Sequence, residues 1–215
     1  MPQGKPNAIQ TSDDLLATEY TRRIYDELEH RPFDRTLLDR FIAALPKTAM
    51  VCDIGSGSGQ IARYLHDRGV HVCGIDSSAA MVARAKQLNP AIEFRRDNFF
   101  ALDIPDETFT AIVGFYAFAN IAKNDIVRAL RELRRVLKTG GYLFARLASD
   151  IGIEELVVSK GNRRYLLPDG SERFLVNEDT LLHYTRELNG TLYEPIKTTN
   201  VQNLRCMTTW CLQKR

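Results

Sequence analysis

The sequence predicts a doubly wound α/β fold, in which a mostly parallel sheet carries helices on both faces. Apolar runs of strand length alternate with segments of helical period between residues 49 and 147. These strand-like runs are almost continuously apolar, which is typical of parallel strands buried on both faces. A chain of 215 residues has the length of one such domain and is too short for two.

Two helices are predicted before the first strand. Residues 1–12 contain Pro2, Gly4 and Pro6 and have the composition of a flexible tail. Apolar residues then recur at helical spacing in two series that end before Pro46: Leu16, Tyr20, Ile24 and Leu28, then Leu37, Leu38, Phe41, Ile42 and Leu45. We expect residues 13–46 to form a helical cap at the start of a single domain, residues 13–215.

The alternating pattern predicts the core of this domain, residues 49–147. We expect strands at 49–54, 71–75, 91–95, 110–116 and 141–147, and helices at 60–68, 78–88 and 124–137. The last of these helices has one apolar stripe, and Gly140 and Gly141 are predicted to end it. Its arginines are predicted to lie on a solvated helix face.

Residues 150–215 break the alternation and are predicted to complete the same domain. The run YLLPDGSERFLV has apolar stretches on either side of Pro168-Asp169-Gly170, which is typical of a β-hairpin. A short helix is expected near 178–188. The two remaining runs, TLYEPIKTTNV and RCMTTWCLQK, are expected to pair as antiparallel closing strands. The complete sheet should therefore have seven strands, with the last strand antiparallel.

The composition excludes several classes of partner. A net charge of +2, from 29 basic and 27 acidic residues, gives no general attraction to nucleic acid or anionic lipid. No apolar run approaches the length of a membrane span, about 20 residues, and the first residues lack a secretory signal. The four cysteines and four histidines show no disulfide or zinc spacing. We expect a cytoplasmic protein without a metal or a membrane partner.

The stretch VCDIGSGSGQ joins the first predicted strand of the core to its first helix. In a doubly wound sheet this loop lies at the carboxyl ends of the strands, where ligands bind. Gly55, Gly57 and Gly59 permit backbone conformations and close approaches that side chains prevent. The loop therefore predicts a site for a nucleotide-like small molecule, with all three glycines beside it.

The glycine spacing and two acidic residues select among nucleotide-like ligands. The dinucleotide fingerprint G-x-G-x-x-G fails because Gln60 occupies its last position, and the Walker pattern fails because no lysine follows in place. Asp53 would repel a pyrophosphate and attract a cation. Asp76 ends the second strand 17 residues after Gly59, where a carboxylate can bind two ribose hydroxyls. A ribose with free hydroxyls and a nearby positive group describes S-adenosylmethionine.

Four stretches resemble, in order and spacing, the motifs of class I S-adenosylmethionine-dependent methyltransferases. They are VCDIGSGSGQ, VCGIDSSAAMVARAK, FRRDNFFALDIPDETFTAIVGFYAFANI and LRELRRVLKTGGYLFARL. The resemblance covers roughly residues 14–147 and implies a Rossmann-like fold, S-adenosylmethionine as cofactor and methyl transfer as activity. A departure is Gly114 inside the fourth strand, which we expect to relieve crowding near the methionine part of the cofactor.

The resemblance also implies a set of cofactor-binding residues. The loop at Gly55 would contact the methionine part, Asp53 its amino group and Asp76 the ribose. Met81 matches a position near the adenine, and Asp97 matches the acid that accepts from the adenine amino group. The full set is Asp53, Gly55, Ser56, Gly57, Gly59, Asp76, Ser77, Met81, Asp97, Asn98 and Phe115.

Three of these residues also have a purely structural interpretation. Met81 would then face the core on the stripe of Val82 and Ala85. Asp76 would be a helix cap, because Ser77 and Ser78 begin a helix. Asp97 would be a solvated acid in a loop. The sequence leaves both interpretations open.

Methyl transfer to a small organic molecule is the reaction that we expect. Displacement at a sulfonium carbon disperses charge, so positioning and exclusion of water can supply most of the catalysis. An oxygen or nitrogen acceptor can require a base or an anion clamp. The candidates for these roles are Tyr20, Tyr116, Arg146 and His183.

The end of the fourth strand narrows the class of acceptor. It reads FYAFAN and lacks the Asn/Asp-Pro-Pro-aromatic tetrad of enzymes that methylate the amino groups of bases. We expect a small acceptor held partly by Tyr116, Phe118 and Tyr165.

Other functions remain as alternatives. Arg163, Arg164 and the arginine-rich helix would suit an RNA or protein acceptor, whose binding should weaken steeply with salt. A cofactor-binding protein without methyl transfer is a further alternative, because the resembling family has no invariant catalytic residue. A nicotinamide-dependent dehydrogenase is disfavoured by the glycine spacing.

Overall fold

The structure is a computed structural model. It describes residues 17–19, 21–22, 24–115, 117–118, 121, 123–149, 158–159, 164–166, 172–201 and 205–215. The predicted tail, residues 1–12, lies outside these ranges. The division of the domain into a cap, a core and a closing part stays a prediction.

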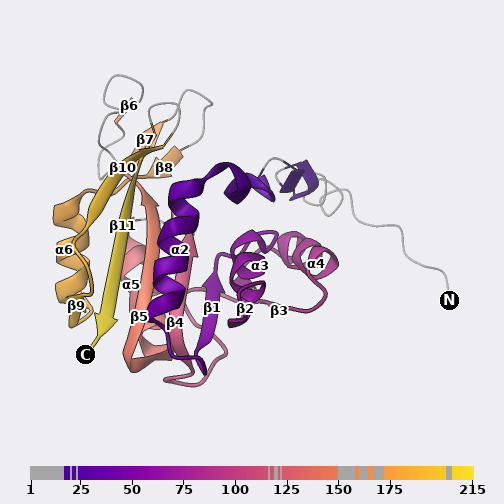
Figure 1. The fold of residues 1–215 in the computed structure, drawn as a ribbon. Coiled ribbons are helices and arrows are strands. Elements are labelled where there is room, and N and C mark those ends of the chain that lie inside the picture. The colour runs from indigo at the N-terminus through magenta and orange to yellow at the C-terminus, as the bar shows by residue number, and fades with distance from the viewer. Residues whose placement is uncertain are drawn as a thin grey trace.

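One large sheet organises the fold, in the order β10-β11-β5-β4-β1-β2-β3 (Figure 1). Its strands are β1 Met50–Ile54, β2 His71–Asp76, β3 Glu93–Arg96, β4 Phe109–Phe115, β5 Leu137–Ala148, β10 Lys197–Val201 and β11 Arg205–Lys214. Strands β1 to β5 run parallel. Strand β11 is antiparallel to β5, and the short β9, Gly190–Leu192, pairs with β11. The predicted doubly wound sheet with an antiparallel last strand is therefore confirmed.

Helices cover both faces of this sheet. They are η1 Glu27–His30, α2 Pro32–Ala44, α3 Gln60–His66, α4 Ala79–Leu88, α5 Lys123–Val136 and α6 Glu178–Glu187. Helices α2, α3 and α4 contribute to the core on one face, whereas α5 and α6 contribute to the core on the other. None of the helices in the described ranges has the length and hydropathy that a membrane span requires.

The first of the two predicted N-terminal helices is interrupted. Residues 17–19, 21–22 and 24 are helical, but residues 27–30 form a separate 3-10 turn before α2. Pro32 occupies the first turn of α2, where it separates α2 from this turn. Leu28 in the 3-10 turn is nevertheless buried, as its apolar spacing predicts.

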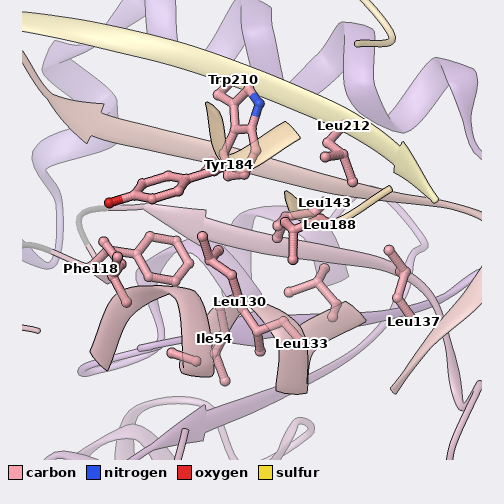
Figure 2. Close-up of a cluster of buried hydrophobic side chains, with 14 of the residues drawn as sticks. Ile54, Phe118, Leu130, Leu133, Leu137, Leu143, Tyr184, Leu188, Trp210 and Leu212 are labelled. Carbon is pink, nitrogen blue, oxygen red and sulfur yellow. The ribbon is translucent and has the colours of Figure 1, made fainter. Parts of the chain in front are cut away.

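The larger core lies between the sheet and helices α5 and α6 (Figure 2). Trp210 of β11 is buried there, and its indole Nε1 donates to Thr185 Oγ1 of α6 at 3.0 Å. Phe118 belongs to the same cluster and is 2% exposed. A side chain at Gly114 would come within 3.1 Å of the Phe118 ring. Gly114 therefore makes room for Phe118 in the core. The expected relief of crowding near the cofactor by Gly114 and the expected acceptor contact of Phe118 stay predictions.

Helix α5 passes directly into β5, so the predicted glycine stop is wrong. The helix ends at Val136 and the strand begins at Leu137. Gly140 and Gly141 lie within β5, close to the point where the register between β4 and β5 shifts. A Cβ atom at Gly141 would lie 2.7 Å from the carbonyl oxygen of Thr110, so glycine is required there for close packing of the two strands.

The arginines of α5 are paired with neighbouring groups of the same molecule. Arg131 forms an ion pair with Glu187 of α6 at 3.0 Å. Arg135 contacts both Glu132 and Asp106 at 2.6 Å. The prediction of a simple solvated face is thus incomplete, because these arginines connect α5 to α6 and to the loop before β4.

A small three-stranded sheet lies at the end of the molecule where the parallel strands have their carboxyl ends (Figure 1). Its strands are β6 Val158–Ser159, β7 Arg164–Leu166 and β8 Glu172–Phe174. Strands β7 and β8 pair antiparallel on either side of the predicted turn, whose residues lie outside the described ranges.

A buried ion pair attaches α2 to the end of β5. The Arg146 guanidinium is 0% exposed, and its Nε donates to Asp34 Oδ1 at 3.1 Å. Its other nitrogens donate to the carbonyl oxygen of Met207 and to the hydroxyls of Thr209 and Thr199, at 2.7 to 3.0 Å. Such a charge is stable in a core only when it is paired and hydrogen-bonded.

Removing Asp34 should be costly. The Asp34→Ala variant leaves the Arg146 charge buried without its partner, and we expect the free energy of unfolding to fall by about 3–5 kcal/mol. Asp39→Ala on the same helix is the matched control, because the Asp39 side chain is 52% exposed in its pair with Arg68 and should cost about 1 kcal/mol or less. Urea denaturation measures both values. Similar losses in the two variants would contradict this role for the buried pair.

Candidate functional site

The glycine loop joins β1 to α3 and is folded onto the end of β2. The backbone N–H groups of Gly55 and Ser56 both donate to the carbonyl oxygen of Ile75, at 2.8 and 3.0 Å. The N–H of Gly59 donates to the carbonyl oxygen of Ser56 at 2.8 Å. The loop therefore has a fixed shape at the carboxyl edge of the sheet.

The three glycines have different reasons for lacking a side chain. All have positive φ, at 68°, 52° and 89° for Gly55, Gly57 and Gly59. A Cβ atom at Gly55 would lie 2.6 Å from Ala117, and one at Gly59 would lie 2.7 Å from Asn89 and from Phe94. Gly57 alone of the three has nothing within 4 Å of that position. Packing against neighbouring residues thus explains why Gly55 and Gly59 lack a side chain. Of the three glycines, only Gly57 faces the open space that a ligand needs.

The Asp76 carboxylate connects the glycine loop to the start of α4. Its Oδ2 accepts from the N–H of Gly57 at 2.9 Å, and its Oδ1 accepts from the N–H of Ser78 at 2.8 Å. The cap of α4 is Ser78, which accepts from the N–H of Met81. Asp76 is half-buried, and each of its oxygens can accept a second hydrogen bond. Ser77 is exposed beside it.

Asp53 is buried below the loop, at 1% exposure. Its Oδ2 accepts from the N–H of Ala62 in the first turn of α3 at 3.0 Å. Burial raises the pKa of Asp53 well above its ordinary value, and the nearby charge of Asp76 raises it further. Ser56 is buried in the same loop, and its hydroxyl has no hydrogen-bond partner among the described residues.

Asp97 and Asn98 form a compact turn after β3. The Asp97 carboxylate accepts from the N–H groups of Asn98 and Asp103, at 2.7 and 3.1 Å. The N–H of Asp97 donates to the carbonyl oxygen of Asp76 at 3.1 Å, so the two acids follow neighbouring strand ends. Asn98 is exposed. Asp97 is therefore part of an ordered turn, unlike the solvated loop acid of the structural interpretation.

Met81 and Phe115 complete the set of expected cofactor residues. Met81 is half-buried on α4, whereas Val82 and Ala85 of the same helix are buried, so the core stripe does not need Met81. Phe115 is 7% exposed at the end of β4, and its ring lies 5.8 Å from that of Phe144. The structure thus places Asp53, Gly57, Asp76, Asp97 and Phe115 on or beside the carboxyl ends of β1 to β4.

The described part of the cap lies beside the first turn of α3 and the end of β4. A cavity of about 20 Å³ lies between them, lined by Glu27, Leu28, Arg31, Asp34, Gln60, Ile61 and Phe115. The Tyr25 hydroxyl donates to Asn89 Oδ1 at 2.7 Å, and Asn89 Nδ2 donates to the carbonyl oxygen of Ser58 at 3.1 Å. Asn89 therefore connects the cap, the loop and α4, a role that its place before Pro90 did not suggest.

The four candidate catalytic residues are not brought together in the described ranges. Tyr20 and Tyr116 lie outside them, as does the side chain of Tyr165. Arg146 directs its donors at Asp34 and at groups of the closing strands, which is a structural arrangement. His183 is exposed on α6, at the far side of the sheet from α3 (Figure 1).

Asp34 is a residue of this region that the sequence analysis missed. It lies on the apolar stripe of α2 with Leu37, Leu38 and Phe41, and all four are buried. Arg146 lies in the apolar run YLFARLA of β5. Opposite charges within two apolar patterns are a signal of a buried ion pair.

In the described ranges, no group of three or more His, Cys, Asp or Glu residues could hold a metal ion.

Comparison with known proteins identifies a domain and its relatives. A family model described as "Methyltransferase domain" matches residues 51–141, which contain the glycine loop and both strand-end acids. The malonyl-[acyl-carrier protein] O-methyltransferase of Enterobacter lignolyticus is 32% identical over 141 residues, covering 63% of this chain and 54% of the relative. The demethylmenaquinone methyltransferase of Renibacterium salmoninarum is 28% identical, covering 65% and 58%. The chain thus spans about half the length of these curated relatives.

Solved structures share the fold at low sequence identity. A SAM-dependent methyltransferase from Methanosarcina mazei has a TM-score of 0.74 and 20% identity, covering 81% of this chain and 96% of that one. The [4+2]-cyclase SpnF has a TM-score of 0.68 and 19% identity, covering 84% of this chain and 81% of that one. At these identities the similarity concerns the fold alone.

The two kinds of glycine can be distinguished by alanine substitution. Gly57→Ala places a side chain at positive φ in open space, which should reduce the free energy of unfolding by about 1 kcal/mol. Gly55→Ala has the same strain and an added clash with Ala117, which should cost a further 1–3 kcal/mol or so. Urea denaturation of both variants tests this order. A Gly57 variant that is the less stable of the two would contradict the packing argument.

Asp53 should make stability depend on pH. Because its pKa is raised in the folded state, the folded protein keeps a proton that the unfolded chain loses above about pH 4. Asp53 therefore stabilises the fold at low pH, and this contribution is lost as the pH rises toward its folded pKa. Asp53→Asn removes the titration and keeps an acceptor for Ala62. We expect the variant to gain stability relative to the wild type as the pH rises, as measured by urea denaturation across a pH series; a constant difference would refute this.

Proposed function

We propose that this chain, whose residues 51–141 match the methyltransferase domain model, is a class I S-adenosylmethionine-dependent methyltransferase that transfers the methyl group of that cofactor to an oxygen or nitrogen of a small organic acceptor. S-adenosylmethionine is the cofactor that the glycine loop and Asp76 predict, and the family is the one that the four stretches of the sequence resemble. The observation that carries the proposal is the joint placement of open Gly57 and half-buried Asp76 at the carboxyl ends of β1 and β2.

The residues at this edge fit the cofactor. Gly57 leaves open space where a side chain would otherwise lie. Asp76 retains hydrogen-bonding capacity for two ribose hydroxyls after accepting from Gly57 and Ser78. We assign the adenine to the region of Met81 and Asp97, and the methionine part to the loop near Asp53 and Phe115.

The contribution of the chain to the reaction is to position the reactants and to exclude water. When bound, the cofactor supplies a methyl group on a positively charged sulfur. The acceptor atom attacks the methyl carbon in line, and the sulfur is the leaving group. Cap residues Glu27, Arg31 and Asp34 lie close to Gln60 and Phe115 across a cavity of about 20 Å³. A cavity of this size holds about one water molecule. The cap is therefore well placed to keep bulk water away from the glycine loop.

A small acceptor is supported by the relatives and by the arginines of α5. The two curated relatives are named for malonyl-[acyl-carrier protein] and for demethylmenaquinone as methyl acceptors. Arg131 and Arg135 are paired with Glu187, Glu132 and Asp106, so they offer less free positive charge than the sequence suggests for an RNA acceptor. A nucleic-acid acceptor would require binding that falls steeply with salt.

A cofactor-binding role without methyl transfer is the second candidate. The fold is shared with the cyclase SpnF, which shows that this architecture also carries other reactions. Of the two candidate catalytic residues that the structure describes, Arg146 is bound to Asp34 and to the closing strands, and His183 is exposed on α6. A methyl-transfer assay with labelled cofactor and a panel of small acceptors distinguishes this candidate from the first.

Calorimetric titration with S-adenosylmethionine and with its demethylated product tests the cofactor site. We expect saturable binding of both, and none of NAD. The Asp76→Ala variant should lose at least about tenfold in affinity, because the ribose hydroxyls and the loop both lose a charged acceptor. Asp67→Ala is the matched control, because Asp67 is exposed at the opposite end of α3 and should bind normally.

Two results would decide against the proposal. Folded wild-type protein that fails to bind either compound would show that the glycine loop has another role. Equal affinity in the Asp76 and Asp67 variants would show that the cofactor does not use the end of β2. Circular dichroism of each variant establishes that it is folded before the titration.

A further inference from the structure

Two thiols lie side by side next to the cofactor loop, and the proposed reaction uses neither. Cys52 of β1 and Cys73 of β2 are direct partners in the parallel pairing of these strands. Both belong to or pack against the core cluster on the face that α5 covers. The two thiols influence each other's ionisation, and both cysteines are free.

The strand register places the two sulfur atoms suitably for a disulfide. Adjacent strands lie about 4.8 Å apart, and disulfides join residues whose Cα atoms are about 4.4–6.8 Å apart. In-register residues of neighbouring strands also point to the same face of the sheet. The other two cysteines differ in this respect, because Cys206 and Cys211 are an odd number of residues apart on β11 and face opposite sides.

The two thiols differ in their reactivity. Interaction with the Cys52 side chain lowers the pKa of Cys73, whereas burial raises the pKa of Cys52 well above its ordinary value. Cys73 is half-buried next to the edge strand β3, where Glu93 is its partner, and Cys52 is 1% exposed. Cys73 is thus the thiol that ionises first and that a small oxidant can reach, and Cys52 lies behind it.

We propose that Cys52 and Cys73 form a redox-sensitive pair that closes to a disulfide on exposure to a peroxide. The Cys73 thiolate attacks one peroxide oxygen, the O–O bond breaks, and a sulfenic acid forms as hydroxide leaves. The Cys52 sulfur then attacks the Cys73 sulfur, the S–O bond breaks, and the S–S bond forms. With the protons that the two thiols release, hydrogen peroxide is reduced to two water molecules as the two thiols are oxidised.

Closure of this pair acts on the cofactor loop. A disulfide fixes the distance between its two sulfurs at about 2.05 Å and restricts the torsion angles of the bridge, so it constrains β1 and β2 relative to each other at this point. Ile75 and Asp76 follow Cys73 by two and three residues, and they accept from the N–H groups of Gly55, Ser56 and Gly57. These bonds connect the constraint to the loop. Oxidation should therefore weaken cofactor binding, a consequence that rests on the proposed function.

Thiol mapping tests the disulfide independently of the cofactor. The full chain is treated with hydrogen peroxide, free thiols are alkylated, and peptides are identified by mass spectrometry. We expect Cys52 linked to Cys73, with Cys206 and Cys211 alkylated, and reversal by dithiothreitol. Cys206→Ser should keep the link and Cys73→Ser should abolish it. Recovery of Cys52 and Cys73 as separate thiols, or of Cys73 linked to another molecule, would overturn the proposal.

Titration with the demethylated cofactor then tests the coupling. Oxidised wild-type protein should bind roughly tenfold more weakly than reduced protein, and peroxide should not change the affinity of Cys73→Ser. Equal affinity of the oxidised and reduced forms would refute the coupling. Reduced protein that does not bind would refute the proposed function and leave the mapping result valid. Cys73→Ala replaces the serine variant if that variant does not fold.

Discussion

The parallel pairing of β1 with β2 is the constraint on which the candidate site depends. Five residue pairs, from Met50 with His71 to Ile54 with Ile75, fix the offset of the two strands. This offset brings the loop after β1 onto the carbonyl of Ile75 and the Asp76 carboxylate onto the N–H of Gly57. Because one edge of a parallel sheet collects all the carboxyl ends, Asp97 and Phe115 reach the same region from β3 and β4.

The N-terminal cap depends on a second interaction, far from β1 and β2 along the sheet. Arg146 of β5 holds Asp34 of α2, and the same guanidinium also binds groups of β10 and β11. A segment early in the chain is thereby attached to strands at its end. Tyr25 attaches the cap again through Asn89, next to the glycine loop. The cap is therefore held at two places, through Asp34 and through Tyr25.

Local pattern was sufficient to predict the sheet, the helices and the glycine loop, because each leaves a short-range signal in the sequence. The roles of single residues were harder to predict. Gly114 was expected to relieve crowding near the cofactor and Phe118 to hold the acceptor, and the structure adds that Gly114 makes room for Phe118 in the core. Gly140 has the sequence signature of a helix end and lies within β5. In each case the role depends on how segments distant in the sequence pack together, which one sequence does not reveal.

The single tryptophan of the chain gives the molecule a built-in optical probe. Trp210 is 1% exposed between β11 and α6, and its indole nitrogen is hydrogen-bonded to Thr185. Indole emission depends on exposure to water, so its wavelength will report whether the closing strands and α6 remain packed. The glycine loop lies several strands away, at β1 and β2. Fluorescence therefore separates loss of the fold from events at the ligand-binding edge without any added label.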